Sequence, residues 1–234
     1  MKHVTQIAMV VCAACLGSCY SPDDQYTTIR SIDLKLDDAT NIYADSISVK
    51  AVTIHMPGLR HKDPMSVKLT TTWGFWSNGL KEKTVNTNYS MDCDCFKVQD
   101  QLRPERTVSS FVINVTGGDQ TGAYYFNAKP RYPETIQLFA DSSALRNRLG
   151  GSTKVKAYLY SSKGPVSYGT VFEFYSPINT GMVPLQVILT KGNFVQSKVV
   201  LTGNISTPNI IISGYVLADN VQSAVQQAQI IIKP

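Results

Sequence analysis

Apolar and polar residues alternate along most of the chain after residue 20, and this period of two predicts β-strands. Segment 32–36 alternates aliphatic with charged residues, and segment 154–159 places Val155, Ala157 and Leu159 on one side. Because successive side chains of a strand point to opposite faces, such patterns describe sheets with one buried and one solvated face. No stretch repeats apolar residues at helical spacing over many turns. We therefore expect an all-β protein.

Further strands are predicted where short apolar runs lie between turn signals rich in Gly, Asn and Pro. These runs are residues 108–115, 124–128, 171–175, 183–190, 194–201, 210–217 and 229–233. Segment 220–229 has a more helical composition, but it leads directly into the last apolar run and is interpreted as a loop. Many short strands without crossover helices favour antiparallel sandwiches.

The chain contains an internal repeat of about domain size. Segment 32–34 is echoed by 136–138, and segment 46–51 is echoed by 152–157, at offsets of 104 and 106 residues. Repeats of this length indicate tandem domains and not solenoid units, which repeat at about 20–50 residues. The sequence thus predicts two β-sandwiches in tandem.

The two halves are connected by a segment with two prolines, Pro130 and Pro133. Proline restricts φ and lacks a backbone N–H, so we expect a short, stiff, extended linker at 130–134. The predicted domains are then residues 29–129 and 135–234. A linker of this kind is expected to be cleaved near Arg131 in limited proteolysis.

The second half resembles bacterial immunoglobulin-like domains of the invasin and intimin type over about residues 134–234. The resemblance rests on Gly150-Gly151-Ser152, Gly164-Pro165-Val166, Val171-Phe172-Glu173-Phe174 and Thr190-Lys191-Gly192, in that order. The first half matches only in its opening strands. The resemblance implies two immunoglobulin-like antiparallel sandwiches that serve as a stalk or adhesive module, and it carries over no catalytic residue.

The N-terminus has the features of an export signal. Lys2 precedes the apolar segment 7–16, which is too short for the ~20 residues that span a bilayer. Leu16-Gly17-Ser18-Cys19 resembles the lipobox of bacterial lipoproteins. This implies that signal peptide 1–18 is removed, that Cys19 is acylated, and that 19–28 forms a tether. An ordinary secretory signal is the alternative.

An acidic pair, Asp23-Asp24, follows the candidate lipid site and resembles the surface-export signal of Bacteroidota lipoproteins. A plain solvated tether is the other interpretation. We expect an outer-membrane, lipid-anchored protein that is exposed on the cell surface, with a periplasm-facing location as the alternative. The expected membrane contact is the lipid on Cys19.

Composition and charge limit the class of partner. Hydrophobic residues make up 43% of the chain and charged residues 17%, which is sufficient for folded cores. The net charge of +5 is dispersed, whereas nucleic-acid binders concentrate Lys and Arg on one face. The best basic group, Arg131, Arg146, Arg148 and Lys154, is interpreted as a solvated rim. We expect no nucleic-acid partner.

Two cysteines, Cys93 and Cys95, remain once the N-terminal signal and Cys19 are accounted for. In an oxidising envelope, leftover thiols usually pair, so a strained disulfide between them is the main expectation. A redox pair and a metal site are the alternatives, although zinc sites usually space their cysteines by two to four residues. The candidate additional ligands are Asp92, Asp94, His55 and His61.

An aromatic cluster, Trp73, Phe75 and Trp76, is the candidate ligand contact. Exposed rings would stack on sugars or anchor a protein partner. We favour the other interpretation, in which Trp73 or Trp76 is a core residue of its sandwich. Strand alternation would place Trp73 and Phe75 on one face and Trp76 on the other.

Hydrolase, dinucleotide-binding, P-loop and zincin signatures are absent from the sequence, so no catalytic residue, metal or cofactor is assigned. Asp45-Ser46-Ile47 resembles a Bacteroidota O-glycosylation acceptor. The functional hypothesis is a non-enzymatic adhesion or interaction module with a protein or glycan partner, with recognition in the first domain. The alternative is a structural accessory subunit of an envelope secretion or nutrient-uptake complex.

Overall fold

A computed structural model describes the chain from residue 29 onward. The described residues are 29–58, 63–176, 180–206, 208–218, 221–222 and 226–233, the last two segments as backbone only. The predicted signal peptide 1–18, Cys19 and the tether 19–28 lie outside them. Within these ranges there is no helix long and apolar enough to cross a membrane.

The first sandwich consists of two antiparallel sheets. One contains, in order, β1 (Asp33–Leu36), β2 (Lys50–Pro57), β7 (Cys95–Arg103) and β4 (Phe75–Trp76), with β6 (Tyr89–Ser90) also paired to β7. The other contains β5 (Glu82–Thr87), β3 (Met65–Thr71), β8 (Ser110–Gly117) and β9 (Gln120–Asn127). Their inward residues form one core, which includes Ile54, Leu69 and Phe111.

The second sandwich repeats this arrangement. One sheet contains, in order, β10 (Thr135–Ala140), β12 (Ser152–Tyr160), β16 (Phe194–Leu201) and β14 (Thr180–Val183). The other contains β11 (Ala144–Arg146), β19 (Gln226–Lys233), β17 (Asn209–Ala218), β13 (Val171–Tyr175) and β15 (Gln186–Ile188), with β18 (Val221–Gln222) paired to β17. A separate core includes Val155, Phe172 and Val199.

The strand orders of the two sandwiches correspond, and they confirm the predicted all-β, immunoglobulin-like fold. The pair β1–β2 in the first sandwich matches β10–β12 in the second. Segments 136–138 and 152–157 lie in β10 and β12, whereas segment 46–51 is a loop that ends in the first two residues of β2. Two sheets of this order, packed face to face, are the arrangement of the immunoglobulin fold. The repeat in the sequence therefore reflects a repeat in topology.

Several strand predictions differ from the structure. Strands β3 and β5 were not predicted, and segment 220–229, interpreted as a loop, contains β18 and the first residues of β19. The predicted strand 183–190 is not continuous: Val183 is the last residue of β14, and β15 begins only at Gln186, because Pro184 has no N–H to continue a ladder. Strand β7 was not predicted because Asp100 occupies an inward position, where an alternating strand normally has an apolar residue.

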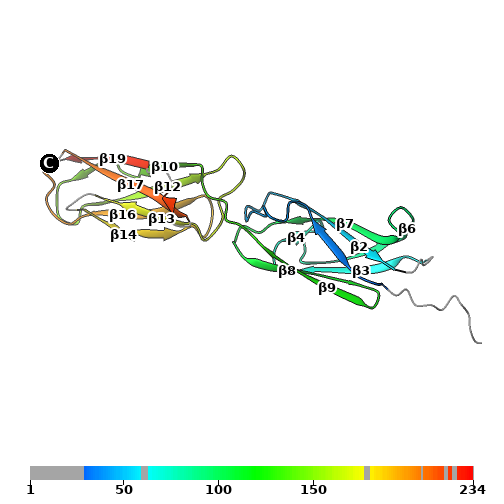
Figure 1. Ribbon diagram of the computed structural model, residues 1–234. Helices are drawn as coiled ribbons and strands as arrows, with labels where there is room; N and C mark the ends of the chain where they lie inside the picture. The colour runs from blue at the N-terminus through cyan, green and yellow to red at the C-terminus, as the bar shows by residue number, and fades with distance from the viewer. Residues whose placement is uncertain are drawn as a thin grey trace, which may run out of the picture.

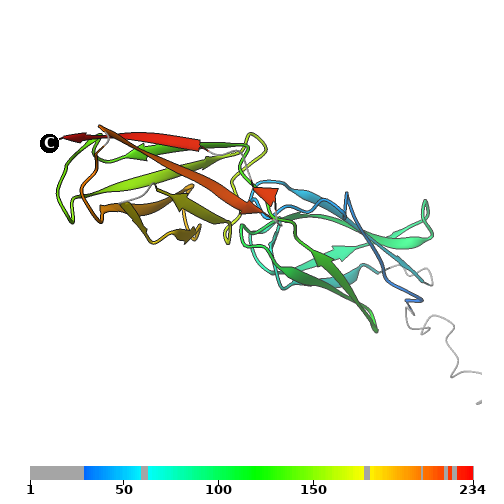
Figure 2. The same ribbon diagram turned by 60° about the vertical axis from the view of Figure 1, so that its left-hand side comes forward.

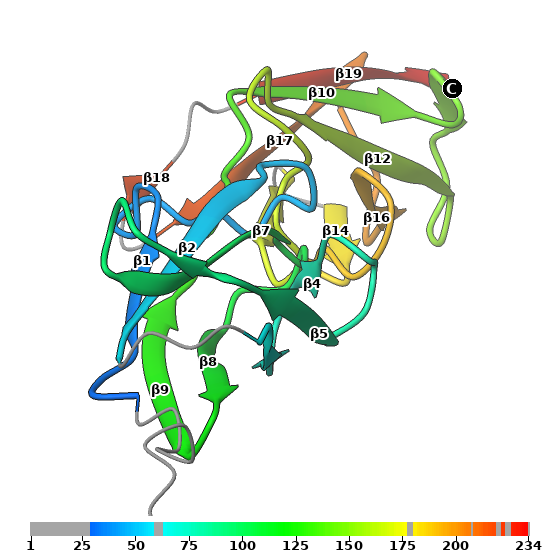
Figure 3. The same ribbon diagram turned by 90° about the vertical axis from the view of Figure 1, so that its right-hand side faces the viewer.

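The two sandwiches lie end to end and give the molecule an elongated shape (Figures 1 and 2). The C-terminal strand β19 lies in the sandwich farther from the start of the described chain (Figure 1). With the first sandwich toward the viewer, β10, β12 and β19 of the second sandwich appear above it (Figure 3). The segments that meet between the sandwiches are loops and the connector.

Candidate functional site

The aromatic cluster lies mainly in the core, as the sequence favoured, so Trp73 and Trp76 are not exposed for the candidate ligand contact. Trp73 is 3% exposed and Trp76 is 1% exposed, whereas Phe75 is half-buried. Gly74 between them has φ +77°, a left-handed conformation that interrupts strand alternation and turns both tryptophans inward. Trp73 and Trp76 therefore belong to the core, and Phe75 is the member of the cluster most accessible for ligand contact.

Trp73 is fixed by contacts on both its ring and its nitrogen. The ring stacks on Phe111 at a centroid distance of 4.8 Å, and Nε1 donates to the Thr107 carbonyl at 2.7 Å. A buried indole satisfied in this way is typical of a core residue.

Phe75 borders a pocket of ≈ 250 Å³ on the first sandwich. The lining residues are Val49, Phe75, Trp76, Ser77, Gly79, Gln101 and Arg103. Phe75 lies opposite Arg103 in the β4–β7 pair, and the Lys81 ammonium lies 5.8 Å from its ring centroid. An aromatic ring beside amide and guanidinium donors has the chemistry of a small polar binding site.

A disulfide joins Cys93, in the turn after β6, to Cys95, the first residue of β7, with Cα atoms 5.2 Å apart. Asp94 between them has φ +51°, and its carboxylate accepts a hydrogen bond from the Tyr89 hydroxyl. In the part of the chain that the structure describes, no three His, Cys, Asp or Glu side chains are grouped to hold a metal. His61, one of the candidate ligands, lies outside that part.

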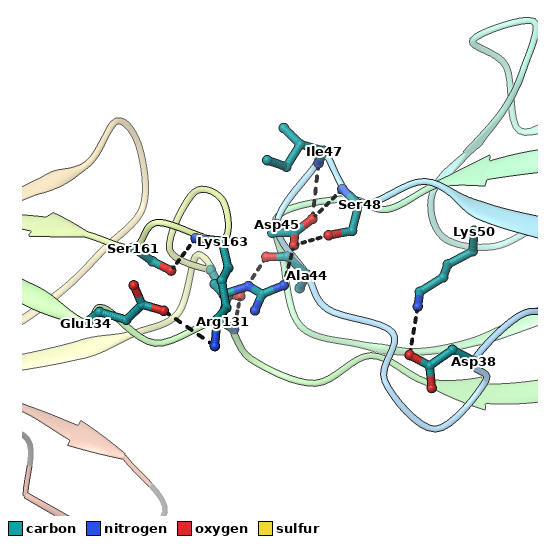
Figure 4. Close-up of polar contacts among 11 residues, drawn as sticks. Asp38, Ala44, Asp45, Ile47, Ser48, Lys50, Arg131, Glu134, Ser161 and Lys163 are labelled. Carbon is teal, nitrogen blue, oxygen red and sulfur yellow. Dashed lines mark hydrogen bonds and ion pairs between the residues drawn. The ribbon is translucent and has the colours of Figure 1, made fainter.

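Asp45, the most deeply buried charged residue in the described part of the chain, lies where the two sandwiches meet (Figure 4). The Asp45 side chain is fully buried and accepts hydrogen bonds from the backbone N–H groups of Ile47 and Ser48 at 3.1 and 2.9 Å. Its Oδ2 also lies 2.9 Å from Arg131 Nη2, and the Arg131 guanidinium stacks on the Tyr43 ring at 3.9 Å. A loop of the first sandwich is thereby tied to the connector.

Burial alone would raise the pKa of Asp45, but the hydrogen bonds from Ser48 and Arg131 outweigh it. The pKa of the carboxyl is therefore lowered from its ordinary value of 3.8. Asp45 is a charged anchor, and its burial is inconsistent with a role as recognition element for a glycosylating enzyme on the folded protein.

Further contacts hold the second sandwich against the first. Ser167 Oγ accepts from the Arg131 backbone N–H at 2.7 Å and donates to the Ala44 carbonyl at 2.6 Å. From the first sandwich, Arg106 Nε donates to the Val166 carbonyl at 2.8 Å, and its guanidinium stacks on Tyr168 at 4.4 Å. We call this set of residues (Asp45, Arg106, Arg131, Ser167) the interdomain joint.

Sequence reasoning did not find the interdomain joint, although it singled out two of its members for other reasons. Arg131 was assigned to a solvated rim, but its side chain is 12% exposed. The available signal was a charged residue between two prolines, together with an acidic residue in the mostly apolar segment 42–47. Nothing in the sequence indicated that the two are partners, because 86 residues separate them.

No protein-family model and no curated protein sequence matches this chain. Among solved structures, adhesin InvE of Yersinia pseudotuberculosis is similar, with 12% identity and a TM-score of 0.56, over 89% of this chain and 60% of that one. Invasin, described as a bacterial integrin-binding protein, has 12% identity and a TM-score of 0.57, over 86% of this chain and 39% of that one.

This chain therefore spans less than two-thirds of the length of either structure. At such low identity the likeness concerns the fold alone. The strand order, the paired cores and these two structures agree: the chain has tandem immunoglobulin-like sandwiches of the kind found in invasin-type bacterial adhesins.

Proposed function

We propose that this chain is a non-enzymatic, lipid-anchored outer-membrane protein, exposed on the cell surface, that acts as an adhesion or interaction module. The observation that carries the proposal is the joint between the sandwiches. Asp45, Arg131 and Ser167 tie two end-to-end sandwiches together, so the pair behaves as a stiff spacer. A stiff spacer projects its far end away from an anchor at Cys19.

Two further observations support this proposal. The two solved structures of similar fold are, by their descriptions, an adhesin and an integrin-binding protein. The lipobox-like Leu16-Gly17-Ser18-Cys19 supplies an attachment point at the end of the chain nearer the first sandwich. Two or three acyl chains, each contributing roughly 0.8 kcal/mol per buried CH₂, would hold the protein permanently in the membrane.

The anchor is tested by replacing the acylated cysteine in cells. Cys19→Ser is expected to move the protein from the detergent phase to the aqueous phase in phase partitioning, because the thiol that takes the lipid is gone. Cys15→Ser is the matched control and should leave partitioning unchanged. Retention of Cys19→Ser in the detergent phase would contradict the anchor.

The adhesive role is tested separately with intact cells. Cells lacking this protein are expected to attach less to host cells or matrix, and the wild-type chain should restore attachment while Cys19→Ser should not. Loss of the protein from protease-treated intact cells would report surface exposure. Unchanged attachment, with the protein recovered in a stoichiometric envelope complex, would instead favour the accessory-subunit alternative.

A further inference from the structure

The outward face of the sheet β10–β12–β16–β14 exposes an aromatic cluster in the second sandwich. Strand alternation directs Phe139, Tyr158, Tyr160 and Phe194 outward, while their neighbours fill the core. Phe139, Tyr160 and Phe194 are 52%, 40% and 41% exposed. Exposed aromatics in contact with one another on one sheet face are unusual enough to suggest a binding surface.

The rings form one connected group. Tyr158 lies at its centre, 5.7 Å from Phe139, 6.3 Å from Tyr160 and 5.5 Å from Phe194 between ring centroids. Tyr158 and Phe194 are direct cross-strand partners in the β12–β16 register. The cluster thus spans three adjacent strands, a surface wide enough for more than one ring of a ligand.

The same face carries an uncompensated positive charge. Lys154 and Lys198 are both exposed and lie directly opposite each other in the β12–β16 register. Like charges in such a position are destabilising, and among the described residues neither lysine has an ion-pair partner. Lys156, the next outward residue on β12, is paired with Asp141 at 3.0 Å. A bound anion would relieve the repulsion between Lys154 and Lys198.

The composition of the face favours a glycan over a protein partner. Its four strands contain three lysines and neither arginine nor an acidic residue. Protein interfaces are enriched in Arg and depleted of Lys. Lysine is a compact point charge suited to carboxylate or sulfate groups, and aromatic rings offer apolar faces on which sugar rings stack. Glu134, at the aromatic end, is engaged by the Ser162 hydroxyl and backbone N–H.

A shallow groove extends the aromatic end of the face toward the interdomain joint. It has a volume of ≈ 470 Å³ and is lined in part by Tyr160, Ser162, Asn193 and Arg106. Ligand sites occur preferentially at such domain boundaries. Hydroxyl, amide and guanidinium groups there would hydrogen-bond a sugar that leads onto the rings.

We propose that this face binds an acidic polysaccharide, with sugar rings on Phe139, Tyr158 and Phe194 and carboxylate or sulfate groups between Lys154 and Lys198. The proposal rests on the proposed function as a surface interaction module and gives it a ligand class and a location. It also moves recognition from the first sandwich to the second, which lies farther from the candidate anchor.

The test measures binding of the full-length chain, purified in detergent, to alginate as a uronate polymer and to chondroitin sulfate as a sulfated one. Dextran is the neutral comparison, and single-stranded DNA is the comparison for any polyanion. We expect binding to an acidic polysaccharide that weakens with salt, and none to dextran. The proposal is overturned if neither alginate nor chondroitin sulfate binds, or if single-stranded DNA binds as tightly as the acidic polysaccharide does.

Paired variants locate the site. Phe139→Ala with Phe194→Ala is expected to weaken binding at least tenfold, and Lys154→Gln with Lys198→Gln severalfold with a shallower salt dependence. Tyr125→Ala and Lys97→Gln, exposed positions on the first sandwich, are the matched controls and should bind normally. The double variant Lys154→Gln with Lys198→Gln should also have a slightly higher melting temperature, because the repulsion between the two lysines is removed. A raised melting temperature would show that this variant folds.

The outcomes separate this proposal from the adhesive function. If both paired variants bind as the wild type does, the ligand site is wrong. If cells carrying these variants still attach while cells lacking the protein do not, the adhesive function stands without this ligand. If attachment never depended on the protein, the function itself fails, whatever the purified chain binds.

Discussion

At the scale of single residues, the burial of the two tryptophans predicts that they contribute to stability and not to ligand contact. Trp76 is 1% exposed, so Trp76→Ala empties a large core site and should lower the free energy of unfolding by about 3–5 kcal/mol. Denaturant unfolding measures the loss. Tyr125→Ala, at a ring that is 79% exposed, is the control and should change stability by less than ~0.5 kcal/mol. A small loss at Trp76 would contradict its place in the core.

Asp45 provides a prediction about pH. The pKa of Asp45 is lower in the folded protein than its ordinary value of 3.8, so the ionised carboxylate stabilises the fold at pH values above 3.8. This stabilisation is lost as the pH falls from 3.8 through the folded pKa. Asp45→Asn removes the buried charge that pairs with Arg131 and should cost about 3–5 kcal/mol at pH 7. The gap in melting temperature between wild type and variant should narrow as the solution is acidified. A gap independent of pH would contradict the role of the carboxylate.

At the scale of elements, the short strand β4 depends on the glycine that precedes it. A Cβ at Gly74 would lie 2.7 Å from the Arg103 carbonyl oxygen, and the residue has φ +77°. Gly74→Ala should therefore combine a backbone penalty of roughly 1–2 kcal/mol with a clash that displaces β4 from β7. Denaturant unfolding, together with amide exchange in β4, measures the effect.

The matched control is Gly79, in the turn that follows β4. Gly79 has nearly the same φ, +78°, but no atom lies within 4 Å of an added Cβ. Gly79→Ala should therefore show the backbone penalty alone. Equal losses for the two variants would mean that the approach to Arg103 contributes nothing.

At the scale of the whole molecule, the connector 130–134 is held in place by the interdomain joint and is not an exposed linker. The Arg131 side chain is 12% exposed, and its backbone N–H is bound to Ser167. A protease needs an accessible, locally unfolded segment, so trypsin should leave the Arg131–Tyr132 bond intact in the native protein. This replaces the expectation, drawn from the two prolines, of cleavage near Arg131.

Loosening the joint should restore that cleavage. Asp45→Ala is expected to expose Arg131 to trypsin and to broaden the particle dimensions measured by small-angle X-ray scattering. Asp38→Ala is the control, because the Asp38 side chain is 48% exposed and its ion pair with Lys50 lies away from the joint (Figure 4). Rapid cleavage of the wild type at Arg131, or equal protection in both variants, would contradict a joint held by Asp45.

The sequence by itself determined the features that depend on local periodicity. Alternation of apolar and polar residues indicated strands such as β13 and β16, and the offset repeat indicated two corresponding sandwiches, because each strand must present one face to a core. The same reasoning listed Trp73, Phe75 and Trp76 together, since the residue types were visible while their directions were not.

Only the tertiary structure decided which side chains meet. The φ of Gly74 turned two tryptophans inward, Asp45 met Arg131 across 86 residues, and pairing of β10, β12 and β16 collected four aromatic rings and two opposed lysines on one face. Such meetings depend on register and on long-range packing, which a period of two does not encode. A side chain's neighbours along the strand follow from sequence, whereas its neighbours across strands and domains follow from the fold.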